Sequence, residues 1–306
     1  MEAMGDVRTV LKDEREAPTP YTLIVALANP AHLEQLLRTA RDVARGNDGE
    51  IVLVSVVHKP ANSPFMLFTG EHIGEAFDDG RRALLDRAAS LPLLEDVPVR
   101  RHLLVSDDVS DAVLRAVREA DADAVLLGWR GRTSASDVVL GTTVDPVVRT
   151  APCDVYVERV GTTADGLERV LFPTVGGSHA EAGAALARAI AAANDATVSV
   201  VSYLPPNPDE ADRNAARELV EATASSIDDV DVETTVRAVD NVEASLVAAA
   251  ADHDLVVLGA TREGGVFRRR QVVGSVAEAV ARQSDPPVVI AKRGDDRSIV
   301  DRLLAR

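Results

Sequence analysis

The chain has 306 residues, 46% hydrophobic and only 3% aromatic, which suffices for two domains with cores built mainly from Ala, Val and Leu. Its formal net charge of −16 argues against nonspecific nucleic-acid binding, which needs a basic face, and no apolar run approaches the roughly 20 residues that span a bilayer. A single cysteine, Cys153, excludes an internal disulfide and a cysteine metal cluster, and the charged first residues lack the apolar core of a signal peptide. We therefore expect a cytoplasmic protein that does not insert into a membrane and does not bind nucleic acid.

The composition of the charged residues is unusual. Lysine occurs only at positions 12, 59 and 292, so nearly all of the 33 basic residues are arginine, and aspartate outnumbers glutamate. Dense short carboxylates with little lysine are typical of a halophilic protein, because a salty cytosol screens high net charge. A high-GC genome is the alternative explanation. We favour the halophilic one, because GC bias alone does not produce so large an acidic excess.

In chain order, the first expected element is a polar lead, residues 1–20, which contains two prolines and is expected to be mobile. Short Val/Ile/Leu runs then alternate with Ala/Arg/Glu-rich segments at helical spacing. This alternation indicates strands buried on both faces of a parallel sheet, with helices on each side. The first five strands are predicted at residues 22–27, 51–57, 99–105, 123–128 and 154–158.

A linker at residues 160–168 precedes a second set of elements. A charged tail at residues 294–306 follows the set and could form one or two amphipathic turns. The strands of this second set are predicted at residues 169–174, 197–203, 232–238, 254–258 and 287–292.

The two sets correspond to each other, which indicates an internal duplication. The segment DAVLLG that begins at Asp123 recurs as DLVVLG from Asp254, and the other strands recur in the same order. An offset of this size, well over a hundred residues, is that of a whole domain rather than of a solenoid repeat. We therefore predict two tandem α/β domains, a first copy at residues 21–159 and a second copy at residues 169–293.

The most informative motif follows the fourth strand of the first copy. It is a glycine loop with the spacing Gly128-x2-Gly131-x9-Gly141-Thr142. Glycines let a backbone approach a ligand closely, and backbone amides at the start of a helix can hold a phosphate. We expect Thr142 to cap the next helix and to contact a phosphate oxygen, with Arg130 screening its charge. Ordinary turn glycines are the alternative, but three at this spacing before a threonine favour a nucleotide site.

The second copy carries a longer version of this motif. It reads Gly259-x4-Gly264-x9-Gly274-Ser275, with two extra residues between the first two glycines. A run of three arginines, residues 268–270, lies inside it. This run is either a solvated face of the loop or a clamp for an anion.

The first motif, in its place behind a strand and in a domain of this size, resembles the ATP-binding branch of the universal stress protein family. The resemblance covers residues 21–293 as a tandem pair. It implies a Rossmann-like (adenine nucleotide alpha hydrolase-like) fold with a five-stranded parallel sheet in each domain. It also implies ATP or a related adenine nucleotide as the ligand, together with Mg²⁺.

Members of that family dimerise, often through their final strands. The resemblance therefore implies that residues 154–158 pair with residues 288–292 in an intramolecular pseudo-dimer. It also implies that the chain can form a homodimer.

Two positions depart from the family pattern. The ATP-binding members carry an aspartate just after the first strand, where its carboxylate accepts hydrogen bonds from the nucleotide. The equivalent positions here are Asn29 in the first copy and Val175 in the second. Asparagine can still donate and accept hydrogen bonds, whereas valine can do neither. The first copy is therefore expected to be the better site.

Other positions that match the family have simpler explanations as well. Val56 and Ser202, at the ends of the second strands, would flank a base or ribose, but a role in the core is equally consistent. Residues 107–108 and 240–241 follow the third strands, where N-capping of a helix explains them without a ligand.

No residue is assigned to catalysis or to a metal. The six histidines show no metal-ligand spacing, and no lysine near either glycine motif would support efficient phosphoryl transfer. We expect a regulatory nucleotide-binding module of the stress response rather than an enzyme, with slow ATP hydrolysis as one alternative. The main alternative is an adaptor that docks on a membrane transporter or another partner without needing a ligand, because the tandem domains also resemble universal-stress regions attached to transporters, including haloarchaeal ones.

Overall fold

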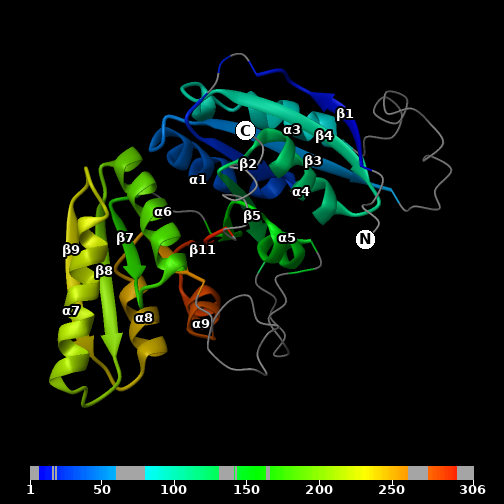
Figure 1. Ribbon diagram of the computed structural model, residues 1–306. Helices are drawn as coiled ribbons and strands as arrows, with labels where there is room; N and C mark the ends of the chain where they lie inside the picture. Colours follow the sequence, from blue (N-terminus) through cyan, green and yellow to red (C-terminus); the bar gives the residue numbers. More distant parts are fainter. Residues whose placement is uncertain are drawn as a thin grey trace, which may run out of the picture. The chain divides into compact units, whose positions relative to one another are not determined.

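A computed structural model describes residues 7–15, 17, 19–59, 80–130, 141, 143–162, 166–260 and 275–294 (Figure 1). These residues divide into two compact units, each described here by itself. The first unit contains the described residues up to Gly128, together with residues 141–155 and Gly294. The second unit contains Trp129, Arg130 and the described residues between Tyr156 and Arg293.

The first unit is a sheet with the strand order β1-β4-β3-β2-β5 and with helices in the connections. Its strands are β1 (Arg8–Lys12), β2 (Thr22–Ala26), β3 (Glu50–His58), β4 (Val99–Ser106) and β5 (Ala124–Trp129). Its helices are η1 (Pro30–His32), α1 (Leu33–Arg45), α3 (Arg81–Ala89), η3 (Pro92–Leu94), α4 (Val109–Ala120) and α5 (Val144–Thr150).

The strands of the second unit have the order β9-β8-β7-β10-β11, in which β9, β8, β7 and β10 correspond to β4, β3, β2 and β5 of the first unit. Its strands are β7 (Arg169–Pro173), β8 (Thr197–Leu204), β9 (Val232–Ala238), β10 (Leu255–Gly259) and β11 (Val288–Lys292). Its helices are α6 (Ser178–Asn194), α7 (Glu210–Ser225), α8 (Val242–Ala250) and α9 (Ser275–Gln283). In Figure 1, α7 runs alongside β8 and β9, the two strands that it contacts.

All ten predicted strands are present. In the first copy, β2 pairs in parallel with β3 and with β5, and β3 pairs in parallel with β4. In the second copy, β7 pairs in parallel with β8 and with β10, β8 with β9, and β10 with β11. The two copies also share an equivalent side-chain hydrogen bond. Asp123 Oδ2 accepts from the backbone N–H of Thr22 at 2.9 Å, and Asp254 Oδ2 accepts from the backbone N–H of Arg169 at 2.9 Å. In both copies an aspartate before the fourth strand therefore fixes the start of the first strand.

The expectation of a mobile lead at residues 1–20 is wrong for part of that segment. Arg8–Lys12 forms β1, which pairs antiparallel with β4 at the edge of the sheet. The antiparallel strand β1 is thus present in addition to the five parallel strands predicted for the first copy. The strand is held by tertiary contacts, because Arg115 of α4 donates to the carbonyl oxygen of Val7 at 2.8 Å and Lys12 forms an ion pair with Glu119.

The boundary between the two units falls inside β6 (Asp154–Arg159), between Val155 and Tyr156. The domain boundaries and the linker predicted for residues 160–168 stay predictions, as does the pairing of residues 154–158 with residues 288–292 in a pseudo-dimer. The predicted tail lies outside the described residues, apart from Gly294.

The sheet of the first unit encloses a histidine that should make stability depend on pH. His102 in β4 is 2% exposed, and its Nε2 has no hydrogen-bond partner among the described residues. Burial, followed by the positive charges of Lys12 and Arg100, lowers the pKa of His102 to about 4. In the folded chain His102 therefore stays neutral at pH values between about 4 and 6.5, where the same histidine is protonated in the unfolded chain.

We predict that the free energy of unfolding falls as the pH drops from about 6.5 to about 4, by up to about 3 kcal/mol through His102 alone. Thermal unfolding of the wild type and of His102→Leu at neutral and at mildly acidic pH measures this contribution. The leucine variant should lose less stability between the two conditions. Equal losses in both proteins would contradict the assignment to His102.

Candidate functional site

The candidate site lies at the carboxyl edge of the first sheet, where two loops leave neighbouring strands. β2 pairs in parallel with β5, with Ala26 opposite Leu127, while β3 and β4 lie on the other side of β2. The chain thus moves outward from β2 to β4 and then returns to β5. Such a reversal of strand order is where open parallel sheets bind ligands. It places the end of β2, which precedes Asn29, next to the part of β5 that leads to Gly128.

Asn29 already uses one of its polar atoms within the protein. Its Oδ1 accepts from the backbone N–H of Ala31 at 2.9 Å and caps η1, in which Pro30 takes the first position. The side-chain amide Nδ2 is the atom that remains to meet a ligand. An asparagine in this arrangement offers a donor, where an aspartate would offer an acceptor.

Arg81 adds a positive charge beside Asn29 that the sequence did not reveal. It is the first residue of α3, it follows Gly80 in a left-handed conformation, and its guanidinium donates to the carbonyl oxygen of Ala28. No local pattern marks this arginine, because residues 60–79 separate it from β3. Only the folded chain shows that it reaches the loop after β2.

The glycine loop of the first copy is described at its two ends. Gly128 lies in β5 and is partly exposed, and Arg130 directly follows that strand. Gly141 has a φ of +109°, a backbone conformation that favours glycine, and no atom of another described residue lies within 4 Å of the place where a Cβ would stand. Gly131 and Thr142 lie outside the described residues.

The helix after this loop, α5, starts at Val144 with Thr143 at its N-cap, and the Thr143 side chain makes no capping hydrogen bond. Thr142 lies outside the described residues, so its role as helix cap and phosphate contact stays a prediction.

The glycine at the end of β10 in the second unit has a packing role. A Cβ on Gly259 would come within 3.1 Å of the carbonyl oxygen of His179 and within 3.3 Å of the amide nitrogen of Ala180. The first turn of α6 therefore rests directly on Gly259 and requires glycine there without a ligand. Val175 is 70% exposed and offers no hydrogen bond.

The remaining predicted residues of the second motif contribute little structural information. Ser275 is the first residue of α9, while Gly264 and Gly274 lie outside the described residues, as do the arginines at 268–270. The described part of the second copy thus favours helix packing over a phosphate site.

For four positions the sequence predicts either a ligand contact or a role in the core or in a helix cap, and their local structure is consistent with the core or cap role. Val56 and Ser202 are buried in β3 and β8. Asp108 caps α4 by accepting from the N–H groups of Ser110 and Asp111, and Asn241 caps α8 by accepting from the N–H of Ala244 at 3.0 Å. These contacts account for the residues without a ligand.

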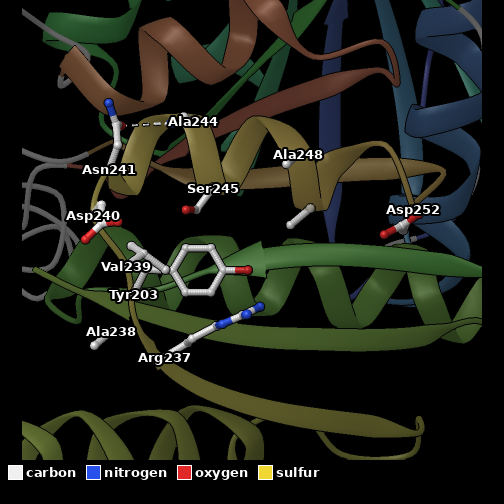
Figure 2. Close-up of a pocket in the computed structure, with 11 residues that line it drawn as sticks. Tyr203, Arg237, Ala238, Val239, Asp240, Asn241, Ala244, Ser245, Ala248 and Asp252 are labelled. Atoms are coloured by element: carbon white, nitrogen blue, oxygen red, sulfur yellow. Dashed lines mark hydrogen bonds between the residues drawn. The ribbon is translucent and has the colours of Figure 1, made fainter. Parts of the chain in front are cut away.

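A groove of about 740 Å³ lies in the second unit between α8 and the ends of β8 and β9. Figure 2 shows the Tyr203 ring and the Arg237 side chain between these strands and the helix. Asp240, Asn241 and Ser245 also line it. No sequence pattern predicts this groove, because it is formed by residues of a helix and of two strand ends that the fold brings together.

Two kinds of feature are absent from the described part of the chain. It contains no group of three or more His, Cys, Asp or Glu side chains placed to hold a metal ion. None of its helices combines the length and the apolar character that crossing a bilayer requires.

Comparison with known proteins identifies relatives that each match about half of this chain. The chain is 28% identical over 158 residues to the Na⁺/H⁺ antiporter NhaS5 of Synechocystis sp., a match that covers 50% of this chain but only 21% of the antiporter. It is 24% identical over 147 residues to a universal stress protein of Staphylococcus aureus (strain USA300), covering 46% of this chain and 85% of the relative. The chain thus spans about a fifth of the length of the antiporter.

Whole-chain similarity is found among solved structures. A universal stress protein from Archaeoglobus fulgidus shares the fold with a TM-score of 0.57 at 15% identity, over 91% of this chain and 98% of that one. The model of the universal stress protein family matches residues 21–159 and again residues 166–292. The chain therefore belongs to the universal stress protein family and carries two of its domains in tandem.

Proposed function

We propose that this chain binds ATP or a related adenine nucleotide in its first copy and acts as a regulatory module whose state depends on occupancy. The observation that carries the proposal is the unbroken spacing from Gly128 to Thr142 in a loop that leaves β5 beside β2, at the reversal of strand order. Backbone amides of this loop would hold the phosphates, with Mg²⁺ as the accompanying cation.

The surroundings of the loop supply the other groups that such a ligand requires. Arg130 follows β5 directly, and the guanidinium of Arg81 donates to Ala28 in the loop after β2; on this proposal both arginines would neutralise phosphate charge. Asn29 offers its Nδ2 as a hydrogen-bond donor. The chain provides no lysine near the glycine loop, which favours binding over efficient phosphoryl transfer.

Calorimetric titration of the full chain with ATP, with and without Mg²⁺ and at high salt, tests the proposal. We expect saturable binding that weakens when Mg²⁺ is removed. If neither ATP nor another adenine nucleotide produced binding heat at millimolar concentration, the nucleotide function would be ruled out. Following ADP release during incubation distinguishes a binding module from a slow hydrolase, and Gly141→Val is the matched control because it should remove both activities.

A second candidate function, an adaptor that docks on a membrane transporter, is favoured by the similarity to the antiporter NhaS5 over half of this chain. On this hypothesis the chain would bind its partner whether or not nucleotide is present. Binding of a purified transporter to the immobilised chain, with and without ATP, separates the two functions. Equal binding in both conditions favours the adaptor, whereas ATP-dependent binding favours the nucleotide-controlled module.

A further inference from the structure

β9 is a free strand edge. It ends the strand order of the second unit, and β8 is its only pairing partner among the described residues. Val198 donates to the carbonyl oxygen of Asp231, and Val239 donates to that of Leu204, so the backbone groups of the odd-numbered residues of β9 face β8. The N–H and C=O groups of residues 232, 234, 236 and 238 therefore face outward.

The first copy shows what the corresponding edge accepts. β4 occupies the place in the first unit that β9 occupies in the second, and its outer edge is covered by the antiparallel strand β1. With that cover most of β4 is buried, whereas Glu233, Thr234, Thr235 and Arg237 of β9 are exposed. The fold thus accommodates an antiparallel strand at this position, and the described part of the second copy supplies none.

β9 has little of the usual protection of an edge strand. Its sequence, VETTVRA, consists mainly of β-branched residues, contains no proline, glycine or lysine, and carries only one charge of each sign. The opposite end of the order, β1, has an irregular register between Thr9 and Leu11 and ends in Lys12. Such features discourage a further strand from pairing there, whereas β9 presents an uninterrupted edge.

The charges of β9 are self-complementary. If two copies of the strand pair antiparallel about Thr235, all seven residues overlap, and Glu233 of each copy stands opposite Arg237 of the other. Thr234 and Val236 then exchange the outward hydrogen bonds, while the charged pairs occupy the closer positions without hydrogen bonds. Pairing centred on Glu233 or on Arg237 would instead place like charges opposite each other.

Both charged side chains are accessible for such pairing. Arg237 lines the groove beside α8, as Figure 2 shows, and it forms no ion pair with another described residue. Glu233 lies on the same face, because side chains two residues apart in a strand share a face. Its ion pair with Arg169, at 3.3 Å, joins two largely exposed groups and leaves Glu233 able to contact a second arginine.

We infer that β9 is a homodimer interface, in which two copies of this chain join their second-unit sheets by antiparallel pairing about Thr235. The inference is independent of nucleotide binding, because β9 lies at the edge of the sheet and the glycine loop belongs to the first copy. It identifies a second copy of the chain as the occupant of this edge.

Charge reversal tests the inference on the full chain by sedimentation equilibrium at low and high salt. Glu233→Arg and Arg237→Glu each place like charges opposite one another twice, so each should raise the dissociation constant of the dimer by about tenfold or more. The double variant Glu233→Arg/Arg237→Glu should restore the dimer. An equal mixture of the two single variants should also restore it, because the heterodimer then regains both opposite-charge pairs.

Cross-linking provides a measurement that does not depend on charge. The chain has one cysteine, the buried Cys153, so Thr235→Cys creates a single accessible thiol that lies opposite its own copy. Mild oxidation should yield a disulfide-linked dimer. Val232→Cys, which the register places opposite Ala238, should yield little and serves as the matched control.

A monomeric wild type at micromolar concentration in low and high salt would overturn the inference. So would a dimer that both single charge variants leave unchanged, since another surface must then hold it. Circular dichroism of each variant shows whether the fold is retained. If a small anion added at millimolar concentration binds the groove through Arg237 while the protein stays monomeric, the groove is a ligand site and the dimer interface is rejected.

Discussion

Gly131→Val is expected to lower the affinity for ATP at least about a hundredfold, or roughly 3 kcal/mol, whereas Gly264→Val should leave it near the wild-type value. The reason is that the glycine motifs of the two copies differ in spacing and in what their glycines contact. The first keeps the spacing from Gly128 to Thr142 at the reversal of strand order, so a branched side chain in the middle of the loop should block close approach of the backbone to phosphate. The second has a longer loop and its Gly259 is explained by helix packing.

The two variants are matched controls for each other, because each adds the same side chain at the corresponding position of a repeated motif. Calorimetric titration of both, with thermal unfolding to confirm that each is folded, gives the comparison. Equal loss in the two variants would mean that both copies contribute to one function. A greater loss in Gly264→Val would transfer the site to the second copy.

Arg100→Met is expected to destabilise the first unit by about 3–5 kcal/mol. Glu50 is 2% exposed and accepts two hydrogen bonds from Arg100, at 2.8 and 2.7 Å, as well as one from Thr22 at 3.2 Å. Burial raises the pKa of Glu50, but the hydrogen bonds and charge of Arg100 and the charge of Arg15 outweigh it, so that the pKa lies below its ordinary value. Without Arg100, a buried carboxylate would keep only part of its compensation.

The matched control is Glu50→Met/Arg100→Met, which removes both charges. Replacing a buried ion pair as a whole costs far less than breaking it, so the double variant should be more stable than either single variant. Urea unfolding at neutral pH gives the free energies. If the double variant instead lost as much stability as the two single variants together, the two residues would not act as a unit.

The strands were predictable because each is a short apolar run buried on both faces, as in β2 and β3. The helix caps at Asp108 and Asn241 were predictable for a similarly local reason, since the side chain bonds to amides two or three residues away. The strand β1 was missed because its five residues lie among charged and proline-containing segments. Its stability comes from pairing with β4, which follows it by almost ninety positions.

The candidate site shows the same limit. Asn29 and the glycine loop stood out in the sequence because family spacing marks them. Arg81 did not, because its contact with Ala28 depends on the path of the chain between β3 and α3. The packing of α6 on Gly259 was likewise invisible, since it joins two segments that lie about eighty residues apart. A motif can therefore indicate a glycine, while only the fold shows whether a ligand or a helix requires it.

The number of ATP molecules bound per chain tests the central claim most directly. Equilibrium dialysis of the wild-type protein with ATP and Mg²⁺ at saturating concentration gives this number without any substitution. Our account predicts one nucleotide per chain, held by the first copy. Two equivalent nucleotides per chain, or none, would contradict it.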